Sequence, residues 1–322
     1  MAKNKFEFEA SYRLLETKLE ELRELSVTLN CDFSHEIANV EKRIAELKAD
    51  RYRHLTPWEQ VLMSRDLERP MTRDYIQLLC SEFVEMHGDR LYGDDPAIVG
   101  GVAVFDGRAI TVIGHQKGKD TNDNIIHNFG MPRPEGYRKA YRLLRQAEKF
   151  GRPVVTFINT PGADPGVGAE ERGEAWAISQ LLLGLSSLKV PVLSVITGEG
   201  GSGGALALTV ADRILMLANA VFSVASPETC ASILLRDIKR ADEMAEALKL
   251  NAKALQDLGI IDEIIEEPVQ EPLLDSPVFT KALHDTIKKH LDEICAQELS
   301  ALLDQRYQRL RLIGKYEQIK TD

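Results

Sequence analysis

Residues 192–206 read VLSVITGEGGSGGAL, and two signals in this stretch decide the fold. The first six residues are mostly apolar and β-branched, which is typical of a strand buried on both faces of a sheet. Glycines dominate residues 198–204 and lead into a helix-forming stretch. We therefore predict a buried strand over 192–197, a glycine-rich loop over 198–205 and then a helix.

Residues 154–168, VVTFINTPGADPGVG, repeat this arrangement. They predict a strand over 154–158, a glycine-rich loop over 159–168 and a helix over 169–188. Two strand–loop–helix units in succession predict an α/β fold whose sheet is at least partly parallel, with right-handed crossovers.

Other elements are predicted around these two units. The β-branched runs 98–105 and 109–113 flank Asp106-Gly107, a strong signal for a β-hairpin. We expect a helix over 73–86 with Thr72 as its N-cap, and a helix over 135–150 that ends at Gly151 and Pro153. A short strand is expected over 221–224.

Three domains follow from the apolar spacing. Residues 1–50 predict a helical hairpin with narrow apolar stripes, which either packs on the chain's own core or docks on a partner. Residues 51–268 form the α/β domain, and 269–322 a C-terminal helical extension. The stripes are Leu15, Leu19, Leu22 and Leu29, then Ile37, Val40, Ile44 and Leu47, and in the extension Leu283, Ile287, Leu291 and Ile294.

The composition narrows the class of protein. The 322 residues carry a net charge of −10, which argues against nucleic-acid binding over the whole surface. The four cysteines lie far apart, with no CxxC pair that would indicate a zinc site. The polar start, Met1 to Ala10, lacks the apolar core of a signal peptide, and no apolar run reaches the roughly 20 residues that span a bilayer. We expect a cytoplasmic protein with no membrane contact.

The two glycine loops are candidate anion sites, because ligands of open α/β sheets bind outside the carboxyl ends of the strands. The helix that follows each loop offers unpaired N–H groups, which suit a developing oxyanion. Glycine clusters also serve close packing of helix on strand. Residues 198–203 match G-x-G-x-x-G, but the acidic partner of a dinucleotide site is not evident, and Gly204 is not followed by the Lys-Ser/Thr of a P-loop.

Longer motifs resemble one family. They are GHQKG at 114–118, NFGMP at 128–132 with PEGYRKA at 134–140, TPGA at 160–163 with PGVGAEERG at 165–173, GEGGSGGAL at 198–206, and SPE at 226–228 with CASIL at 230–234. Through most of its length, including RYQRL at 306–310, the chain is similar to the alpha subunits of bacterial and plastid acetyl-CoA carboxylase carboxyltransferase. The resemblance implies the crotonase-like (ClpP/crotonase) fold, a spiral of ββα units, with the N-terminal hairpin and C-terminal helices added.

An activity and partners are implied as well. The family transfers the carboxyl group of carboxybiotin to acetyl-CoA, which gives malonyl-CoA for fatty acid biosynthesis. Carboxybiotin arrives on the biotin carboxyl carrier protein, and biotin carboxylase belongs to the same ATP-dependent complex. The alpha chain acts with a beta chain of the same fold in an α2β2 assembly. Zinc is expected only in the beta chain, and no covalently bound cofactor is expected here.

Carried over by motif, the resemblance makes the N–H groups of Gly203 and Gly204 the oxyanion hole for the ureido oxygen of biotin. The thioester oxygen of acetyl-CoA is expected in the beta chain's own hole. Gly162 and Ala163 form a second catalytic loop. Substrate contacts are expected from Gly200, Gly201, Ser202, Lys117, Lys119 and Arg138, and no metal ligand is expected.

Three positions depart from the family pattern. Asn159 stands where Asp is frequent, Asp164 where Tyr or another large residue is common, and Thr229 where Gly is usual. We interpret Asp164 as a solvated loop residue, although a carboxylate there could alter the preferred donor.

Alternatives remain open for several residues. Arg138, Arg142, Arg145 and Lys149 share a helix face that is either solvated or binds phosphates or an acidic carrier. The histidines at 115 and 127 are either structural or acid–base groups. Alternative functions are a non-catalytic scaffold, a carboxyltransferase for another acyl-CoA such as propionyl-CoA, and a stand-alone acyl-CoA hydratase or isomerase that uses Glu199 and Glu228.

Overall fold

The computed structural model describes residues 10–29, 31–269 and 271–314, and is built on one eight-stranded sheet. The hydrogen-bonded order is β1-β2-β3-β4-β5-β6-β8, with β7 paired to the end of β5. The strands are β1 (Glu82–Glu85), β2 (Ile98–Phe105), β3 (Arg108–His115), β4 (Val154–Thr160), β5 (Val192–Gly201), β6 (Arg213–Leu217), β7 (Val221–Ser223) and β8 (Glu263–Ile265).

Strand direction alternates over β1, β2 and β3 and is constant from β3 onward. The β2–β3 hairpin pairs Ile98 with His115 and Phe105 with Arg108, and its turn places Asp106 and Gly107 at φ 47° and 76°. This is the left-handed pair that a two-residue hairpin requires, so the Asp-Gly prediction is confirmed. From β3 onward the pairings β3–β4, β4–β5, β5–β6 and β6–β8 are parallel, as the strand–loop–helix repeats predicted.

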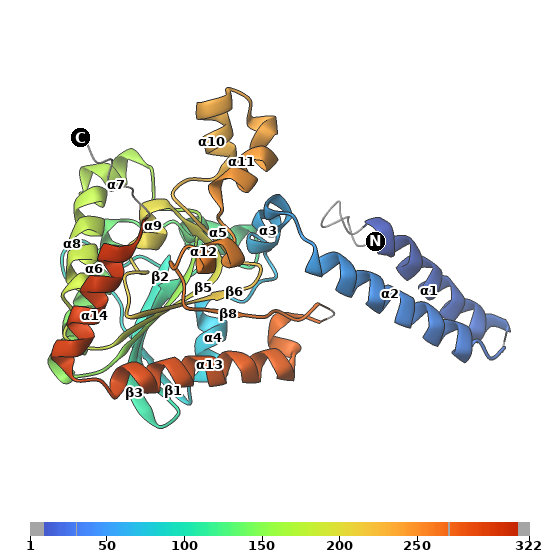
Figure 1. Ribbon diagram of the computed structural model, residues 1–322, viewed down its shortest axis with the longest axis horizontal. Helices are drawn as coiled ribbons and strands as arrows, with labels where there is room; N and C mark the ends of the chain where they lie inside the picture. The colour runs from blue at the N-terminus through green and yellow to red at the C-terminus, as the bar shows by residue number, and fades with distance from the viewer. Residues whose placement is uncertain (1–9, 30, 270, 315–322) are drawn as a thin grey trace, which may run out of the picture.

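Helices cover this sheet (Figure 1). Helix α6 packs on β2, β3 and α8, whereas α13 contacts β5 and β8. The predicted face of α13, from Leu283 to Ile294, is buried in the same cluster as the strands. The α-helices are α1 (Ala10–Leu29), α2 (Ser34–Arg53), α3 (Pro57–Ser64), α4 (Thr72–Leu79), α5 (Thr121–Ile126), α6 (Pro134–Phe150), α7 (Val167–Glu171), α8 (Glu174–Ser186), α9 (Ser202–Leu206), α10 (Pro227–Cys230), α11 (Ala241–Leu248), α12 (Ala252–Asp257), α13 (Pro277–Cys295) and α14 (Leu299–Leu312).

The predicted helix over 73–86 is wrong in its second half. Helix α4 ends at Leu79, and Glu82–Glu85 instead adds an antiparallel edge strand to β2. Thr72 does not act as the N-cap either. Its hydroxyl donates to the carbonyl of His115 at 2.5 Å, and Met71 takes the cap position, with its N–H bonded to the Asp74 carboxylate. Tertiary pairing therefore overrides the local helix signal.

Other boundaries also differ from the prediction. The helix expected over 169–188 is broken into α7 and α8 at Gly173, which adopts φ 83°. Strand β5 continues through the predicted loop to Gly201, because its last residues pair with β7 and with Thr160 of β4. The strands β6 and β8 were not predicted; both are short, and they are set by pairing rather than by their own sequence.

The N-terminal helices α1 and α2 form the predicted hairpin and extend away from the sheet (Figure 1). Leu19 and Ile44 are buried in the contact between them, and ion pairs join Lys48 to Glu16 and Arg23 to Glu41. Residues 1–9 lie outside the described residues, as do Asn30 in the break between the helices, Gln270 near the predicted domain boundary, and 315–322. No helix in the described ranges is long and apolar enough to cross a bilayer.

The last helix is held by one buried arginine. The guanidinium of Arg306, with a side chain 0% exposed, pairs with both carboxylate oxygens of Asp212 at 2.7 and 2.8 Å. It also donates to the carbonyls of Leu185, Leu188 and Val190, where α8 leads into β5. One side chain thus ties α14 to the end of α8 and the start of β6.

We predict that Arg306→Ala lowers the free energy of unfolding by about 3–5 kcal/mol, because it leaves the Asp212 carboxylate buried without its counter-charge. Urea denaturation followed by circular dichroism measures this loss. Arg311→Ala, on the exposed face of the same helix, is the matched control and should change stability by less than about 0.5 kcal/mol. Equal losses in the two variants would contradict the role of Arg306.

Candidate functional site

The two glycine-rich segments touch at one place, which we call the loop crossing: Pro161–Ala163 after β4 and Gly200–Gly204 at the end of β5. A Cβ atom on Gly204 would lie 2.5 Å from the backbone nitrogen of Ala163 and 2.6 Å from the carbonyl carbon of Gly162. A Cβ on Gly201 would collide with the Pro161 carbonyl. Glycine is therefore required at both positions by the approach of backbone to backbone.

Helix α9 begins at this crossing. Ser202, at φ 55°, turns the chain from β5 into α9, so that Gly203 and Gly204 occupy the first turn of a helix. The first N–H groups of a helix have no acceptor within it. Within the described part of the chain, neither N–H donates a hydrogen bond. Gly203 is half-buried, and a Cβ atom there would have no neighbour within 4 Å, so this side of the loop is open.

An ion cluster fixes the end of β5 from one side. The Glu199 carboxylate accepts from Arg65 at 2.7 Å and from Lys117 at 3.3 Å, and Arg65 also pairs with Glu228 of α10. Burial lowers the pKa of Lys117, and the adjacent Glu199 opposes that shift. The predicted substrate residue Lys117 therefore lies inside the protein with its ammonium group paired. The exposed Lys119, by contrast, bonds to Asp74 at 2.7 Å.

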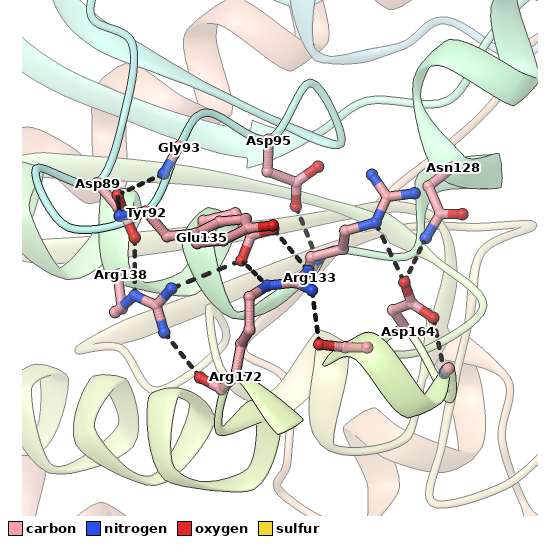
Figure 2. Close-up of polar contacts among 12 residues, drawn as sticks. Asp89, Tyr92, Gly93, Asp95, Asn128, Arg133, Glu135, Arg138, Asp164 and Arg172 are labelled. Carbon is pink, nitrogen blue, oxygen red and sulfur yellow. Dashed lines mark hydrogen bonds and ion pairs between the residues drawn. The ribbon is translucent and has the colours of Figure 1, made fainter. Parts of the chain in front are cut away.

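A second polar network fixes the other loop (Figure 2). Arg138, near the start of α6, pairs with Asp89 at 2.8 Å and donates to the carbonyl of Arg172 at 3.0 Å. Arg172 in turn pairs with Glu135 at 2.8 Å. The side chain of Arg138 is only 11% exposed. A solvated helix face and a phosphate-binding face would each require Arg138 to be exposed. Its side chain is instead buried in ion pairs, so neither interpretation holds for the first residue of the stripe.

Asp164 is not the solvated loop residue that we predicted. Its carboxylate accepts from the Asn128 amide at 3.1 Å and from the N–H of Gly166 at 2.8 Å, and pairs with Arg133 at 3.3 Å (Figure 2). It therefore joins the loop after β4 to the segment before α6. A carboxylate is suited to this position because three donors converge on it.

The other two departures have local roles. The side-chain oxygen of Asn159 accepts from the N–H of Glu199 at 3.3 Å, which links the ends of β4 and β5. Thr229 lies in the first turn of α10, where its N–H donates to the capping hydroxyl of Ser226 at 3.1 Å. These contacts do not direct Asn159 or Thr229 toward the open side of Gly203.

His115 is fully buried behind the crossing. Burial lowers the pKa of its imidazole to about 3, against the opposing effect of the Gly204 and Phe157 backbones. The ring is therefore neutral at physiological pH. The other candidate histidine, His127, bonds to Asp123 in its own helical turn at 3.0 Å.

Glu174, at the start of α8, was missed by the sequence analysis. The residue is 6% exposed, and neither carboxylate oxygen has a hydrogen-bond partner among the described residues. Burial, together with the charges of Asp164, Asp95 and Glu135, raises the pKa of this carboxyl to about 8, while Arg138 opposes the shift. An acidic residue at the start of a helix ordinarily indicates a favourable interaction with the helix dipole, so no local pattern predicts a neutral carboxylic acid at this position.

Little enclosed space exists at the crossing in this chain. A cavity of about 10 Å³ lies there, lined among others by Arg65, Pro161 and Gly201. A cavity of about 400 Å³ lies elsewhere, between α4 and β1, and none of the predicted site residues lines it. Small-molecule sites usually enclose several hundred Å³, so the crossing forms one wall of a site rather than a pocket.

Comparison with known sequences identifies relatives. The family model for acetyl co-enzyme A carboxylase carboxyltransferase-like proteins matches residues 5–314. The acetyl-coenzyme A carboxylase carboxyl transferase subunit alpha of Syntrophomonas wolfei is 55% identical over 316 residues, 98% of this chain and 99% of that one. The subunit of the same name from Heliobacterium modesticaldum is 54% identical over 308 residues, 96% of this chain and 92% of that one.

Solved structures share the fold at low identity. A chain of the transcarboxylase 12S core superposes with a TM-score of 0.60 at 18% identity, over 73% of this chain and 44% of that one. A chain of a Pseudomonas malonate decarboxylase hetero-tetramer gives 0.58 at 16% identity, over 77% and 96%. The chain therefore has the mixed α/β fold of crotonase-like carboxyltransferase domains, as predicted.

We predict that Glu174→Gln makes stability less dependent on pH. The folded carboxyl keeps its proton to about pH 8, whereas the unfolded one loses it near 4.5, so the wild type loses stability as pH rises between these values. Glutamine carries no such proton, so the variant should gain relative to the wild type from pH 5 to pH 8. Urea denaturation at several pH values measures the difference. Parallel stability curves for the two proteins would contradict the prediction.

Proposed function

Because the chain belongs to the family of acetyl-CoA carboxylase carboxyltransferase alpha subunits, we propose that its loop crossing binds carboxybiotin and stabilises the biotin anion during carboxyl transfer. The chain is the carboxyltransferase alpha component of acetyl-CoA carboxylase. The observation that carries the proposal is the pair of unpaired N–H groups of Gly203 and Gly204, on a loop that Gly201 and Gly204 allow to lie against Gly162 and Ala163.

The reaction places charge where these donors are. When the N–CO₂ bond of carboxybiotin breaks, carbon dioxide leaves and a ureido anion remains. That anion takes a proton from the methyl group of acetyl-CoA, and the resulting enolate carbon bonds to carbon dioxide to give malonyl-CoA. Two N–H groups aimed at the ureido oxygen stabilise the anion, and one such donor contributes about 3–4 kcal/mol in comparable sites. The bound biotin itself supplies the base.

The side chains nearby support a donor site rather than a hydratase. A hydratase needs carboxylates that are free to handle water. Glu199 and Glu228 are instead joined by Arg65, and Glu199 also bonds to Lys117. Burial alone would raise the pKa of Glu228, but the hydrogen bond and charge of Arg65 bring it below its ordinary value. Both carboxylates are therefore engaged by cationic side chains, which disfavours the hydratase alternative.

The missing wall of the site favours a partner chain. The cavity of about 10 Å³ beside Arg65, Pro161 and Gly201 has room for about one water molecule, so we infer that another protein encloses biotin and acetyl-CoA. We assign that role to a beta subunit in an α2β2 assembly, with its own oxyanion hole for the thioester and its own zinc, and to the biotin carboxyl carrier protein that brings carboxybiotin. The name "subunit alpha" of the relatives supports a complex of several chains.

The proposal includes a contact with the phosphates of the substrate. Of the three basic residues predicted to bind substrate, Arg138 and Lys117 are engaged in buried ion pairs, whereas the side chain of Lys119 is 63% exposed. We therefore assign a phosphate contact to Lys119. The identity of the acyl group, acetyl or propionyl, depends on the wall that the partner supplies.

We expect malonyl-CoA formation only when this chain is assembled with the beta subunit. The measurement compares the chain alone with the co-expressed complex, using a carboxylated biotin donor and acetyl-CoA. Activity of the isolated chain on an enoyl-CoA would favour the hydratase reading instead. A complete complex that forms no malonyl-CoA would contradict the proposed function.

We predict that Gly203→Ala separates stability from activity. The added methyl group meets no atom of this chain, and alanine in a helix is about 0.5–1 kcal/mol more stable than glycine, so the unfolding free energy should stay level or rise. The methyl group enters the open side of the donors, so kcat should fall about 10-fold or more, since a displacement of about 1 Å can cost 100-fold.

Gly93→Ala is the matched control, because a Cβ atom at Gly93 also has no neighbour within 4 Å and lies outside the crossing. It should leave kcat within about twofold of the wild type. Full activity of Gly203→Ala in a folded complex would favour the scaffold reading, in which the partner alone performs the chemistry.

A further inference from the structure

Three residues with unpartnered buried polar atoms surround the loop crossing. Among the described residues, the hydroxyl of Tyr137, both imidazole nitrogens of His115 and both carboxylate oxygens of Glu174 are buried without a hydrogen-bond partner. The backbone of Gly204 is near enough to His115 to raise the pKa of its imidazole against the effect of burial. The charge of Glu174 is near enough to Tyr137 to raise the pKa of its hydroxyl. Buried polar groups are nearly always paired in folded proteins, so a cluster of exceptions at one place calls for a functional explanation.

Tyr137 has the closest relation to the crossing. Its hydroxyl lies 2.9 Å from the position of a Cβ atom on Gly204, and the backbone nitrogen of Ala163 lies 2.5 Å from that same position. The residue itself is 0% exposed. The hydroxyl therefore lies where Gly204 and the Gly162–Ala163 peptide meet.

Tyr137 is held in place by helix α6. It lies in the first turn of α6, whose entry is held by the bond from the Arg133 N–H to the Asp95 carboxylate at 2.7 Å (Figure 2). The pairs Arg138–Asp89 and Arg172–Glu135 hold the same turn on either side of Tyr137. The position of the hydroxyl is therefore set by α6 and its ion pairs.

Packing alone does not explain the hydroxyl. A phenylalanine would fill the same core position with its ring and bury no unpartnered oxygen, so the hydroxyl is an energetic cost to the folded chain. A group that costs stability and lies between two loops of a site can act by setting their separation, because N–H donors must be aimed accurately before an anion forms.

We propose that Tyr137 is a positioning residue for the anion site: its hydroxyl sets the distance between Gly204 and the Gly162–Ala163 peptide, and thereby the direction of the Gly203 and Gly204 N–H groups. This inference rests on the proposed function of those donors. It assigns Tyr137 no contact with substrate.

The test is Tyr137→Phe in the assembled carboxyltransferase. Its matched control is Tyr75→Phe, which also removes a fully buried, unpartnered tyrosine hydroxyl, but in α4, where the ring stacks on Phe157. Both variants should melt at or above the wild-type temperature. Tyr137→Phe should lower kcat about 10-fold while the KM for acetyl-CoA stays within about twofold, since the thioester is assigned to the partner chain. Tyr75→Phe should retain wild-type kinetics.

A second measurement does not depend on turnover. Hydrogen–deuterium exchange of a peptide that contains Gly203 and Gly204 should accelerate in Tyr137→Phe and not in Tyr75→Phe, because the loop loses its support. Wild-type kcat, unchanged exchange of this peptide, or equal losses of activity in the two variants would each overturn the assignment.

The outcome for Gly203→Ala separates the two proposals. If that variant is impaired and Tyr137→Phe is fully active, the donors act in catalysis and only the role of Tyr137 is wrong. If Gly203→Ala is fully active in the complex, the proposed anion site fails, and the role of Tyr137 fails with it.

Discussion

The contact of backbone on backbone at the loop crossing is the constraint on which this site depends. Strands β4 and β5 are parallel neighbours, so their carboxyl ends reach the same edge of the sheet, and the chain leaves both strands there. Side chains at Gly201 or Gly204 would push Pro161–Ala163 away. Because both positions lack side chains, the first turn of α9 lies against the other loop. Glycine contributes here through the room that it leaves, and the chemistry belongs to the peptide groups.

Charged networks hold the crossing from both sides. Arg65 and Lys117 fix the end of β5 through Glu199, while Arg133, Arg138 and Arg172 fix the other loop and the start of α6. Buried ion pairs contribute little net stability, because desolvation offsets much of their attraction. Their effect is geometric, since each fixes the distance between two segments that are far apart in the sequence. This explains why most of the lysine and arginine residues that were predicted to bind phosphates lie inside the protein, paired with carboxylates.

Local signals in the sequence were sufficient for part of this arrangement. The Asp106-Gly107 hairpin, the two strand–loop–helix units and the C-terminal apolar face depend on neighbouring residues. They were predicted in type and order, although the bounds of the loop after β5 and of the helix after β4 differ. The strand at Glu82–Glu85 and the bond from Thr72 to His115 depend on segments distant in the sequence, and helix propensity there predicted the opposite. The roles of Asp164 and Glu174 were missed for the same reason. From the sequence alone, a carboxylate is predicted to be solvated or to cap a helix, because its spatial neighbours are not known. In the structure three donors surround Asp164, and three acidic residues lie near Glu174.

The folded chain therefore keeps several groups in states that a stability optimum would avoid. The hydroxyl of Tyr137, the neutral His115 and the protonated Glu174 are buried without partners, and the N–H groups of Gly203 and Gly204 donate no hydrogen bond among the described residues. Their occurrence together around one crossing is typical of a site in which preorganisation is maintained at some expense of folding energy. Under the proposed function, a partner chain covers these groups, so that their working environment is that of the assembled carboxyltransferase. The unpartnered groups and the need for a partner would then have one cause, a site that two chains share.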